Sequence, residues 1–225
     1  MKTKTRSVIK IIEEQVKKWQ IMKVKEKKEA IVFPVITISR EPGSGGRIVA
    51  TELGKKLGLD VFHQEIINEM AESAQVSSRI LETLDEKGLS VLEEWITSLV
   101  DNQHLWPDQY LRHLMKVIGT IGKHGSAVIV GRGANFVLPS EGRIRVRIVA
   151  PLDVRVENVS SNFGVSAEDA KRRIIRTESQ RRAFIRKYFN ADITDPINYD
   201  LVLNTGTLSI EAAANAIKSA SKSAG

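Results

Sequence analysis

A glycine-rich stretch and a set of arginines are the residues of this 225-residue chain whose types and spacing could do chemistry. The stretch runs Ser39-Arg-Glu-Pro-Gly-Ser-Gly-Gly46 and is followed directly by Arg47. Glycines let backbone N–H groups converge on an anion, and a helix beginning here would add the positive end of its dipole. The stretch is therefore suited to bind a polyphosphate. A glycine turn that only joins a strand to a helix is the alternative.

The stretch departs from the phosphate-loop pattern G-x-x-x-x-G-K-[ST] at three positions. Glu41 stands for the first glycine, Arg47 for the lysine and Ile48 for the hydroxyl residue that would hold Mg²⁺. Arginine keeps the cation and can grip two phosphate oxygens, although it is not a compact point charge like lysine. Ile48 cannot ligate a metal, so any Mg²⁺ would depend on other oxygens, on water and on the phosphates themselves.

The arginines differ in how strongly they indicate a site. Arg132 follows the apolar run Ala127-Val-Ile-Val130 and stands between two glycines, where a charge has no packing reason to be. Ligands gather at the carboxyl ends of parallel strands, which favours a functional role for Arg132. Arg172, Arg182 and Arg186 belong to a charged helical segment, where a solvated face is the better interpretation.

Short apolar runs that alternate with helical segments set the expected architecture. Strands are predicted at 35–38, 127–130, 144–150 and 200–204, and helices at 47–57, 167–189 and 210–217. Residues 64–122 are predicted to be largely helical, with breaks at Lys87-Gly88 and Trp106-Pro107. This order is typical of an α/β domain with a parallel sheet that is buried on both faces.

Composition narrows the classes of protein and locates the charge. The absence of cysteine excludes disulfides, cysteine-ligated metal sites and a cysteine nucleophile, and a cytoplasmic location is the simplest expectation. We see neither a secretory signal nor an apolar run long enough to span a membrane. Residues 1–30 hold ten Lys/Arg against four Glu, so most of the net charge of +7 lies in a basic helical arm.

The arm also carries an apolar stripe at helical spacing, formed by Ile9, Ile12, Val16 and Trp19. We favour packing of this stripe on the body or on a partner helix. Contact of the arm with nucleic acid or with an acidic membrane stays open as an alternative.

Three segments in the right order resemble the cytidylate kinase-like family of P-loop kinases. They are Ile36-Thr-Ile-Ser-Arg-Glu-Pro-Gly-Ser-Gly-Gly-Arg47, Val128-Ile-Val-Gly-Arg-Gly-Ala-Asn-Phe136 and Asp195-Pro-Ile-Asn-Tyr-Asp-Leu-Val-Leu-Asn-Thr205. The resemblance implies a three-layer P-loop kinase fold over residues 34–218, with a basic helical extension at 1–33 and a flexible tail at 219–225. Within the domain, residues 64–122 would form the acceptor side and 155–190 lid-like helices.

The resemblance also implies an activity and a site. ATP, with Mg²⁺, would phosphorylate a nucleoside monophosphate, in the first place CMP or dCMP. The ATP phosphates would be wrapped by Pro42, Gly43, Ser44, Gly45, Gly46, Arg47 and Ile48. Arg132 would bind the monophosphate, Arg181 would reach the acceptor, and Glu178, where relatives have Asp, would help to place it. Arg47, Arg132 and Arg181 are the expected catalytic cations, and the metal ligands are left unassigned.

Two departures from the family keep other hypotheses open. His63 stands where relatives often have a carboxylate, and Arg155 is the one arginine kept after the third strand, where relatives carry several. A nucleotide-binding regulatory module with weak or no turnover is the first alternative, and a tether to nucleic acid or membrane through the arm is the second. The sequence does not fix the base or the oligomeric state.

Overall fold

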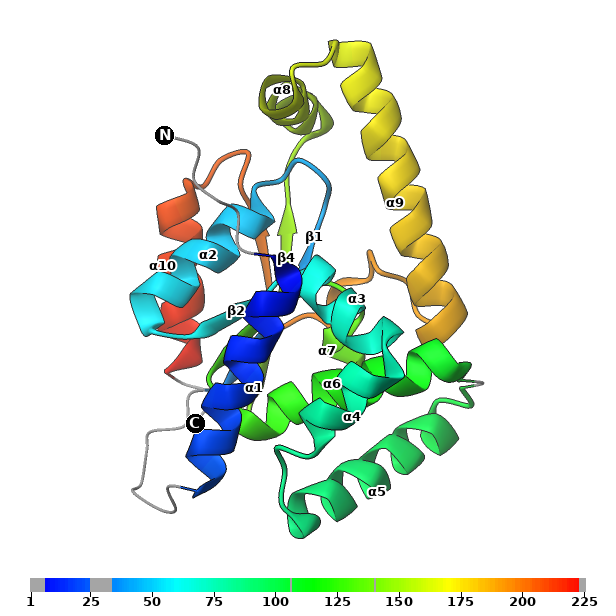
Figure 1. Cartoon of the computed structure of the whole chain (residues 1–225). Coiled ribbons are helices and arrows are strands. Elements are labelled where there is room, and N and C mark those ends of the chain that lie inside the picture. The colour runs from blue at the N-terminus through cyan, green and yellow to red at the C-terminus, as the bar shows by residue number, and fades with distance from the viewer. Residues whose placement is uncertain (1–6, 25–33, 106, 140, 223–225) are drawn as a thin grey trace. The chain divides into compact units, whose positions relative to one another are not determined.

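The computed structural model describes residues 7–24, 34–105, 107–139 and 141–222 (Figure 1). The chain divides into two compact units. Unit 1 comprises residues 1–32 and 63–125, and unit 2 comprises residues 33–62 and 126–225. Unit 1 contains helices α1 (Val8–Val24), α3 (Gln64–Glu72), α4 (Ala74–Leu81), α5 (Glu86–Asn102) and α6 (Gln109–His124). Unit 2 contains β1 (Val35–Arg40), α2 (Gly46–Leu57), β2 (Asp60–Phe62), β3 (Ala127–Val130), α7 (Ala134–Val137), β4 (Arg143–Val149), α8 (Leu152–Phe163), α9 (Ala167–Phe189), the 3₁₀ turn Pro196–Asn198, β5 (Leu201–Asn204) and α10 (Ile210–Ser221).

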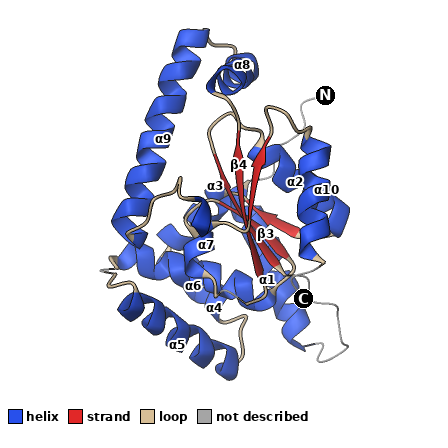
Figure 2. Ribbon diagram, turned by 180° about the vertical axis from the view of Figure 1, so that it is seen from behind, coloured by secondary structure: helices blue, strands red, loops and turns tan. Residues whose placement is uncertain are grey.

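Unit 2 is built on a five-stranded parallel sheet with the order β2-β3-β1-β4-β5, seen in red in Figure 2. The four predicted strands correspond to β1, β3, β4 and β5. The short β2 was not predicted. It has only three residues and pairs with β3 from Asp60↔Ala127 to Phe62↔Ile129, so its existence depends on a partner far along the chain.

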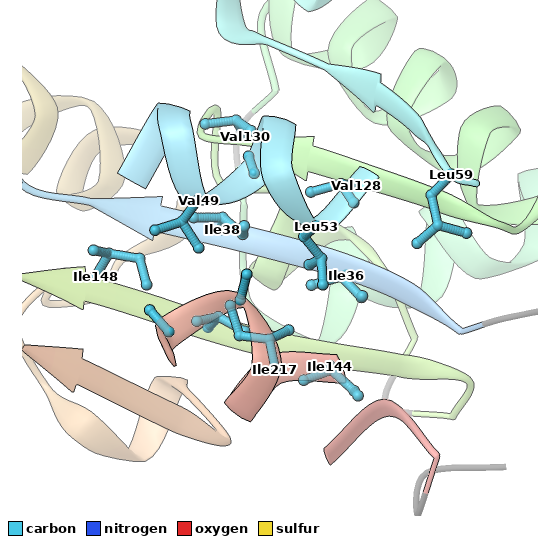
Figure 3. Close-up of a cluster of buried hydrophobic side chains, with 14 residues drawn as sticks. Ile36, Ile38, Val49, Leu53, Leu59, Val128, Val130, Ile144, Ile148 and Ile217 are labelled. Atoms are coloured by element: carbon cyan, nitrogen blue, oxygen red, sulfur yellow. The ribbon is translucent and has the colours of Figure 1, made fainter. Parts of the chain in front are cut away.

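One face of the sheet packs against α2 and α10 and forms the core of unit 2. Ile36 and Ile38 of β1, Val128 and Val130 of β3, and Ile144, Val146 and Ile148 of β4 are buried there. Figure 3 shows these side chains gathered with Leu53 of α2 and Ile217 of α10. Side chains alternate along a strand, so every second residue of these runs faces the two helices.

The opposite face of β4 carries charged side chains. The alternating residues Arg143, Arg145 and Arg147 lie on that face. Arg145 makes a two-pronged ion pair with Asp200 at 2.6 and 3.1 Å, and Arg147 is 6% exposed. Burial lowers the pKa of Arg143 to about 10, with a smaller contribution from the charge of Arg145. The sheet therefore keeps guanidinium groups on the face that α2 and α10 do not cover.

Unit 1 is entirely helical in its described residues, and α1 is part of it. Ile12, Val16 and Trp19 of the predicted stripe are buried, whereas Ile9 is 60% exposed. The ring of Trp19 stacks on His124 at 4.5 Å, and α1 packs against α3. Most of the apolar stripe thus packs against other helices of unit 1, as its spacing favoured. Residues 1–6 and 25–33 of the predicted arm lie outside the described residues.

His124 ties three helices of unit 1 together. Its Nε2 lies 2.8 Å from the hydroxyl of Thr83, which donates to the carbonyl of Ile80 in α4. Burial lowers the pKa of His124 to about 4, so the ring is neutral near pH 7. The ring is therefore a packed element of the core of unit 1.

Two predicted boundaries shift by a few residues in the structure. The break expected around Lys87-Gly88 falls at residues 82–85, because the carboxylate of Asp85 accepts from the amide of Gly88 and caps α5. The expected flexible tail begins too early, since Ser219 to Ser221 belong to α10 and Ser221 is 4% exposed. The other break was predicted at Trp106-Pro107, and Trp106 lies outside the described residues. In the part of the chain that the structure describes, we find no helix with the length and apolar character needed to cross a membrane.

Candidate functional site

The glycine-rich stretch forms a tight loop between β1 and α2. Gly43 and Gly45 have φ angles of +83° and +73°, a conformation that favours glycine, and Gly45 is the N-cap of α2. Ser44 is buried, and its hydroxyl donates to the carbonyl of Glu41 at 2.9 Å. The first amides of a helix point out of its N-terminus, which places those of α2 at this loop as donors for an anion, although the amide of Ile48 already donates to the carbonyl of Gly45 at 2.8 Å.

The two residues that follow the loop lie on the surface. Arg47 is exposed in the first turn of α2, and Ile48 is 57% exposed. A guanidinium on a flexible stem at this place can reach a phosphate held by the loop. Ile48 presents only a hydrocarbon side chain there and adds no metal ligand.

Glu41 connects the loop to β4 and α8, a link that the sequence did not reveal. Its Oε2 accepts from the amide of Ala150 at 3.1 Å and lies 3.5 Å from Nε of Arg155. Its Oε1 lies 3.9 Å from Nη2 of Arg147. A carboxylate in the position of the first pattern glycine thus binds two arginines and one backbone amide.

Two other contacts hold the loop in place. The hydroxyl of Thr205, at the end of the third motif, donates to the carbonyl of Ser44 at 2.6 Å. The side-chain amide of Asn158 donates to the carbonyl of Gly43 at 2.9 Å. The third motif therefore braces the phosphate loop from the end of β5, and α8 braces it from the end of β4.

Arg132 follows β3 in a strained turn. Gly131, Arg132 and Gly133 have φ angles of +83°, +57° and +69°. The guanidinium of Arg132 lies 5.1 Å from the ring centroid of Phe184 in α9. Its Nε is buried and has no hydrogen-bond partner among the residues that the structure describes. A buried donor without an acceptor is costly, and an anionic ligand would supply one.

Glu178 and Arg181 both lie on α9 and both reach the phosphate loop region. Nη1 of Arg155 donates to Oε1 of Glu178 at 2.6 Å. Nη1 of Arg181 donates to the carbonyl of Arg40, the last residue of β1, at 2.7 Å. The structure thus brings Glu178 and Arg181 next to the predicted ATP loop.

A pocket opens where these groups meet, entirely within unit 2. Its lining consists of Arg40, Glu41, Pro42, Arg147, Glu178, Arg181, Arg182 and Ile193. Four arginines against two glutamates give the lining a formal charge of +2. Such a lining suits a phosphorylated ligand, because guanidinium groups bind phosphate oxygens in pairs.

Arg40 and Arg147 were not predicted as lining residues, and Arg182, interpreted from the sequence as part of a solvated face, lines the pocket as well. Arg147 is held by Nη1 donating to the hydroxyl of Ser39 at 2.8 Å and by the ring of Tyr199 at 5.6 Å. An arginine in the middle of the alternating strand Arg143–Val149 was the available signal. Arg40 lies at the carboxyl end of β1, where ligands of parallel sheets gather.

The donor set for a divalent metal is poor in the described residues. Within these ranges, no three His, Asp or Glu side chains lie close enough together to hold a metal ion.

Comparison with known proteins gives a matching family model and curated relatives of the same kind. The model of the cytidylate kinase-like family matches residues 35–207. The cytidylate kinase of Methanopyrus kandleri is 31% identical over 196 residues, which cover 83% of this chain and 92% of that protein. The cytidylate kinase of Ignicoccus hospitalis is 29% identical over 185 residues, covering 82% and 96%.

A solved structure shows the same fold. The crystal structure of an uncharacterized protein from Eubacterium ventriosum aligns with a TM-score of 0.64 at 20% identity, covering 84% of this chain and 99% of that chain. The five-stranded parallel sheet flanked by helices is the expected P-loop kinase architecture. With a family match that spans the phosphate loop, the Arg132 turn and the third motif, the chain belongs to the cytidylate kinase-like family of P-loop kinases.

Proposed function

We propose that this protein transfers the γ-phosphoryl group of ATP to a nucleoside monophosphate, with CMP or dCMP as the acceptor, and releases two diphosphates. One observation carries the proposal: the glycine loop and the arginine-lined pocket share Arg40, Glu41 and Pro42. A triphosphate on the loop would therefore lie beside arginines that suit the phosphate group of an acceptor. The names of the relatives support the choice of the cytosine nucleotides.

The reaction needs little from the protein beyond placement and fixed positive charge. A phosphate oxygen of the acceptor attacks the γ-phosphorus, and the bond from phosphorus to the bridging oxygen of ADP breaks. The amides at the start of α2 would hold the ATP phosphates, with Arg47 reaching over them. Arg132 and Arg181 would hold the acceptor phosphate and stabilise the charge on the transferred group.

The loop suits ATP through its backbone amides, because Gly43 and Gly45 take a left-handed conformation and pack too closely on the protein to carry a side chain. A Cβ at Gly43 would meet the backbone of Arg155 at 2.5 Å, and one at Gly45 would meet Ile210 at 2.8 Å. Mg²⁺ fits less well, since Ile48 occupies the usual ligand position. Phosphate oxygens and water would supply its ligands, so we assign no step of this chain's residues to the metal.

A coupled assay with ATP, Mg²⁺ and each nucleoside monophosphate tests the proposal. We expect turnover with CMP and dCMP at higher kcat/KM than with UMP, AMP or GMP. Binding of nucleotides without turnover, seen as a thermal shift alone, would favour the regulatory module instead.

Contact with nucleic acid through α1 is the second candidate, and one observation favours it. Lys10, Lys17 and Lys18 are exposed on α1, while its apolar stripe packs inside unit 1. Binding through several phosphates would weaken steeply as salt rises. An oligonucleotide titration at two salt concentrations tests this, and no binding at low salt would end it.

A further inference from the structure

Arg155 of α8 lies between two carboxylates that come from different elements. Its Nη1 donates to Glu178 of α9 at 2.6 Å, and its Nε donates to the carbonyl of Ala150 at 2.9 Å. The same Nε lies 3.5 Å from Oε2 of Glu41 in the phosphate loop. The side chain of Arg155 is only 9% exposed, while those of Glu41 and Glu178 are 20% and 24% exposed.

This arrangement gives Arg155 a different part from that of a phosphate-binding lid arginine. Its charge is balanced by two carboxylates, and a buried charge of this kind is stable only while it stays paired. Its hydrogen bonds to Ala150 and Glu178 and its ion pair with Glu41 instead connect α8 to α9 and to the phosphate loop. We name Glu41, Arg155 and Glu178 the clasp.

The clasp fixes the face of α9 that carries Arg181. Residues three apart on a helix lie on the same face, so the position of Glu178 determines where Arg181 points. Arg181 donates to the carbonyl of Arg40 at 2.7 Å, and both Glu178 and Arg181 line the pocket. A rotation of α9 that released Glu178 would also withdraw Arg181 from the pocket.

We propose that Glu178 is a positioning residue that acts through Arg155, and that the clasp holds Arg181 at the acceptor phosphate. This inference rests on the proposed function for the identity of the acceptor. It gives Glu178 a role that needs no contact with the nucleotide, in place of direct placement of the acceptor. Glu41 then serves the same purpose from the phosphate loop.

A kinetic double-mutant cycle tests the proposal. Glu178→Gln keeps the shape of the side chain and removes its charge, and we expect kcat/KM for the monophosphate to fall about 30-fold. In an Arg181→Ala background the same change should cost less than threefold, because the group being positioned is gone. The decrease in Tm caused by Glu178→Gln should be the same in both backgrounds, which separates positioning from stability.

Two further variants control for the removal of any carboxylate from α9 and for poor folding of Glu178→Gln. Glu168→Gln removes a carboxylate from an exposed ion pair with Arg172 on the same helix and should leave kcat/KM and Tm unchanged. Glu178→Asp keeps the charge with a shorter reach and serves if the Gln variant does not fold. A loss of kcat/KM that is equal in both backgrounds would overturn the proposal.

The outcome is separable from failure of the proposed function. If the unmodified protein shows no turnover with any monophosphate, the proposed function fails. The clasp is then tested separately by amide hydrogen exchange in the absence of nucleotide. Exchange across residues 178–184 should be at least about tenfold faster in Glu178→Gln than in Glu168→Gln. Equal exchange in the two variants would overturn the clasp itself.

Discussion

Gly43 offers the sharpest test of the phosphate loop, because an alanine there meets backbone atoms. Its φ of +83° is strained for any residue with a Cβ, and the added carbon would stand 2.5 Å from the carbonyl oxygen and 3.0 Å from Cα of Arg155. A backbone cannot turn aside like the end of a side chain, so the loop or α8 must shift. We expect Gly43→Ala to disturb the amides that would hold the ATP phosphates.

The magnitude follows from a matched glycine in the same unit. Gly58, at the end of α2, has a φ of +66°, and no atom of the described chain lies within 4 Å of a Cβ placed there. Gly58→Ala therefore measures the backbone strain alone, about 1–2 kcal/mol. Gly43→Ala adds the steric contact and a weakened bond from Asn158 to the Gly43 carbonyl, so we expect a further ~1–2 kcal/mol.

Two measurements on Gly43→Ala and Gly58→Ala test the placement of the triphosphate on the loop. Urea unfolding gives the free energy of unfolding of each, and calorimetry gives the affinity for a non-hydrolysable ATP analogue. We expect Gly43→Ala to bind the analogue at least about 30-fold more weakly, a loss of ~2 kcal/mol, and Gly58→Ala to bind it like the unmodified protein. Equal affinities in the two variants would refute the placement of the triphosphate on this loop.

Three further predictions concern single side chains. Arg132→Ala should raise the KM for the monophosphate by about 10²-fold with little change in the KM for ATP, since its buried Nε would pair with the acceptor; an exposed control, Arg172→Ala, should leave both KM values as they are. Arg47→Ala should weaken ATP binding in calorimetry, and an unaltered affinity would remove Arg47 from the site. His124 keeps a pKa of about 4 in the folded state against 6.5 when unfolded, so the unfolded state binds more protons between those values and stability falls as the pH drops from about 6.5 to 4. The free energy of unfolding should fall by about 2 kcal/mol more over this range in the unmodified protein than in His124→Gln, after discounting for partial exposure, and urea titrations at pH 7 and 4.5 measure it.

Patterns within short segments predicted much of the fold. Apolar periodicity and glycine positions are local signals in the sequence. They predicted four of the five strands, the helix after the glycine loop and the helical character of residues 64–122. The strand β2 was not legible, since Asp60-Val-Phe62 becomes a strand only by pairing with β3. The end of α10 was missed for a related reason: Ala- and Ser-rich residues look frayed until packing buries Ser221.

The arrangement of the candidate site depends on distances between charged groups that are far apart in the sequence. These distances could not be predicted from the sequence. In the phosphate-loop pattern, Glu41 stands in the place of the first glycine and therefore counts as a departure from the motif. In the fold its carboxylate meets Arg155 and Arg147, which come from α8 and β4 and lie more than a hundred residues further along the chain. The same substitution that weakens the motif match thus strengthens the connection of the loop to its surroundings.

The number of arginines that directly follow the third strand differs from the number of cations that line the pocket. After the third strand this chain keeps Arg155, and that residue is buried and neutralised by Glu41 and Glu178. The cations that line the pocket come instead from the end of β1, the middle of β4 and the second half of α9. A guanidinium contributes to phosphoryl transfer only where it faces the transferred charge, so the place of each arginine in the fold, and not the count in one segment, determines whether the site can work.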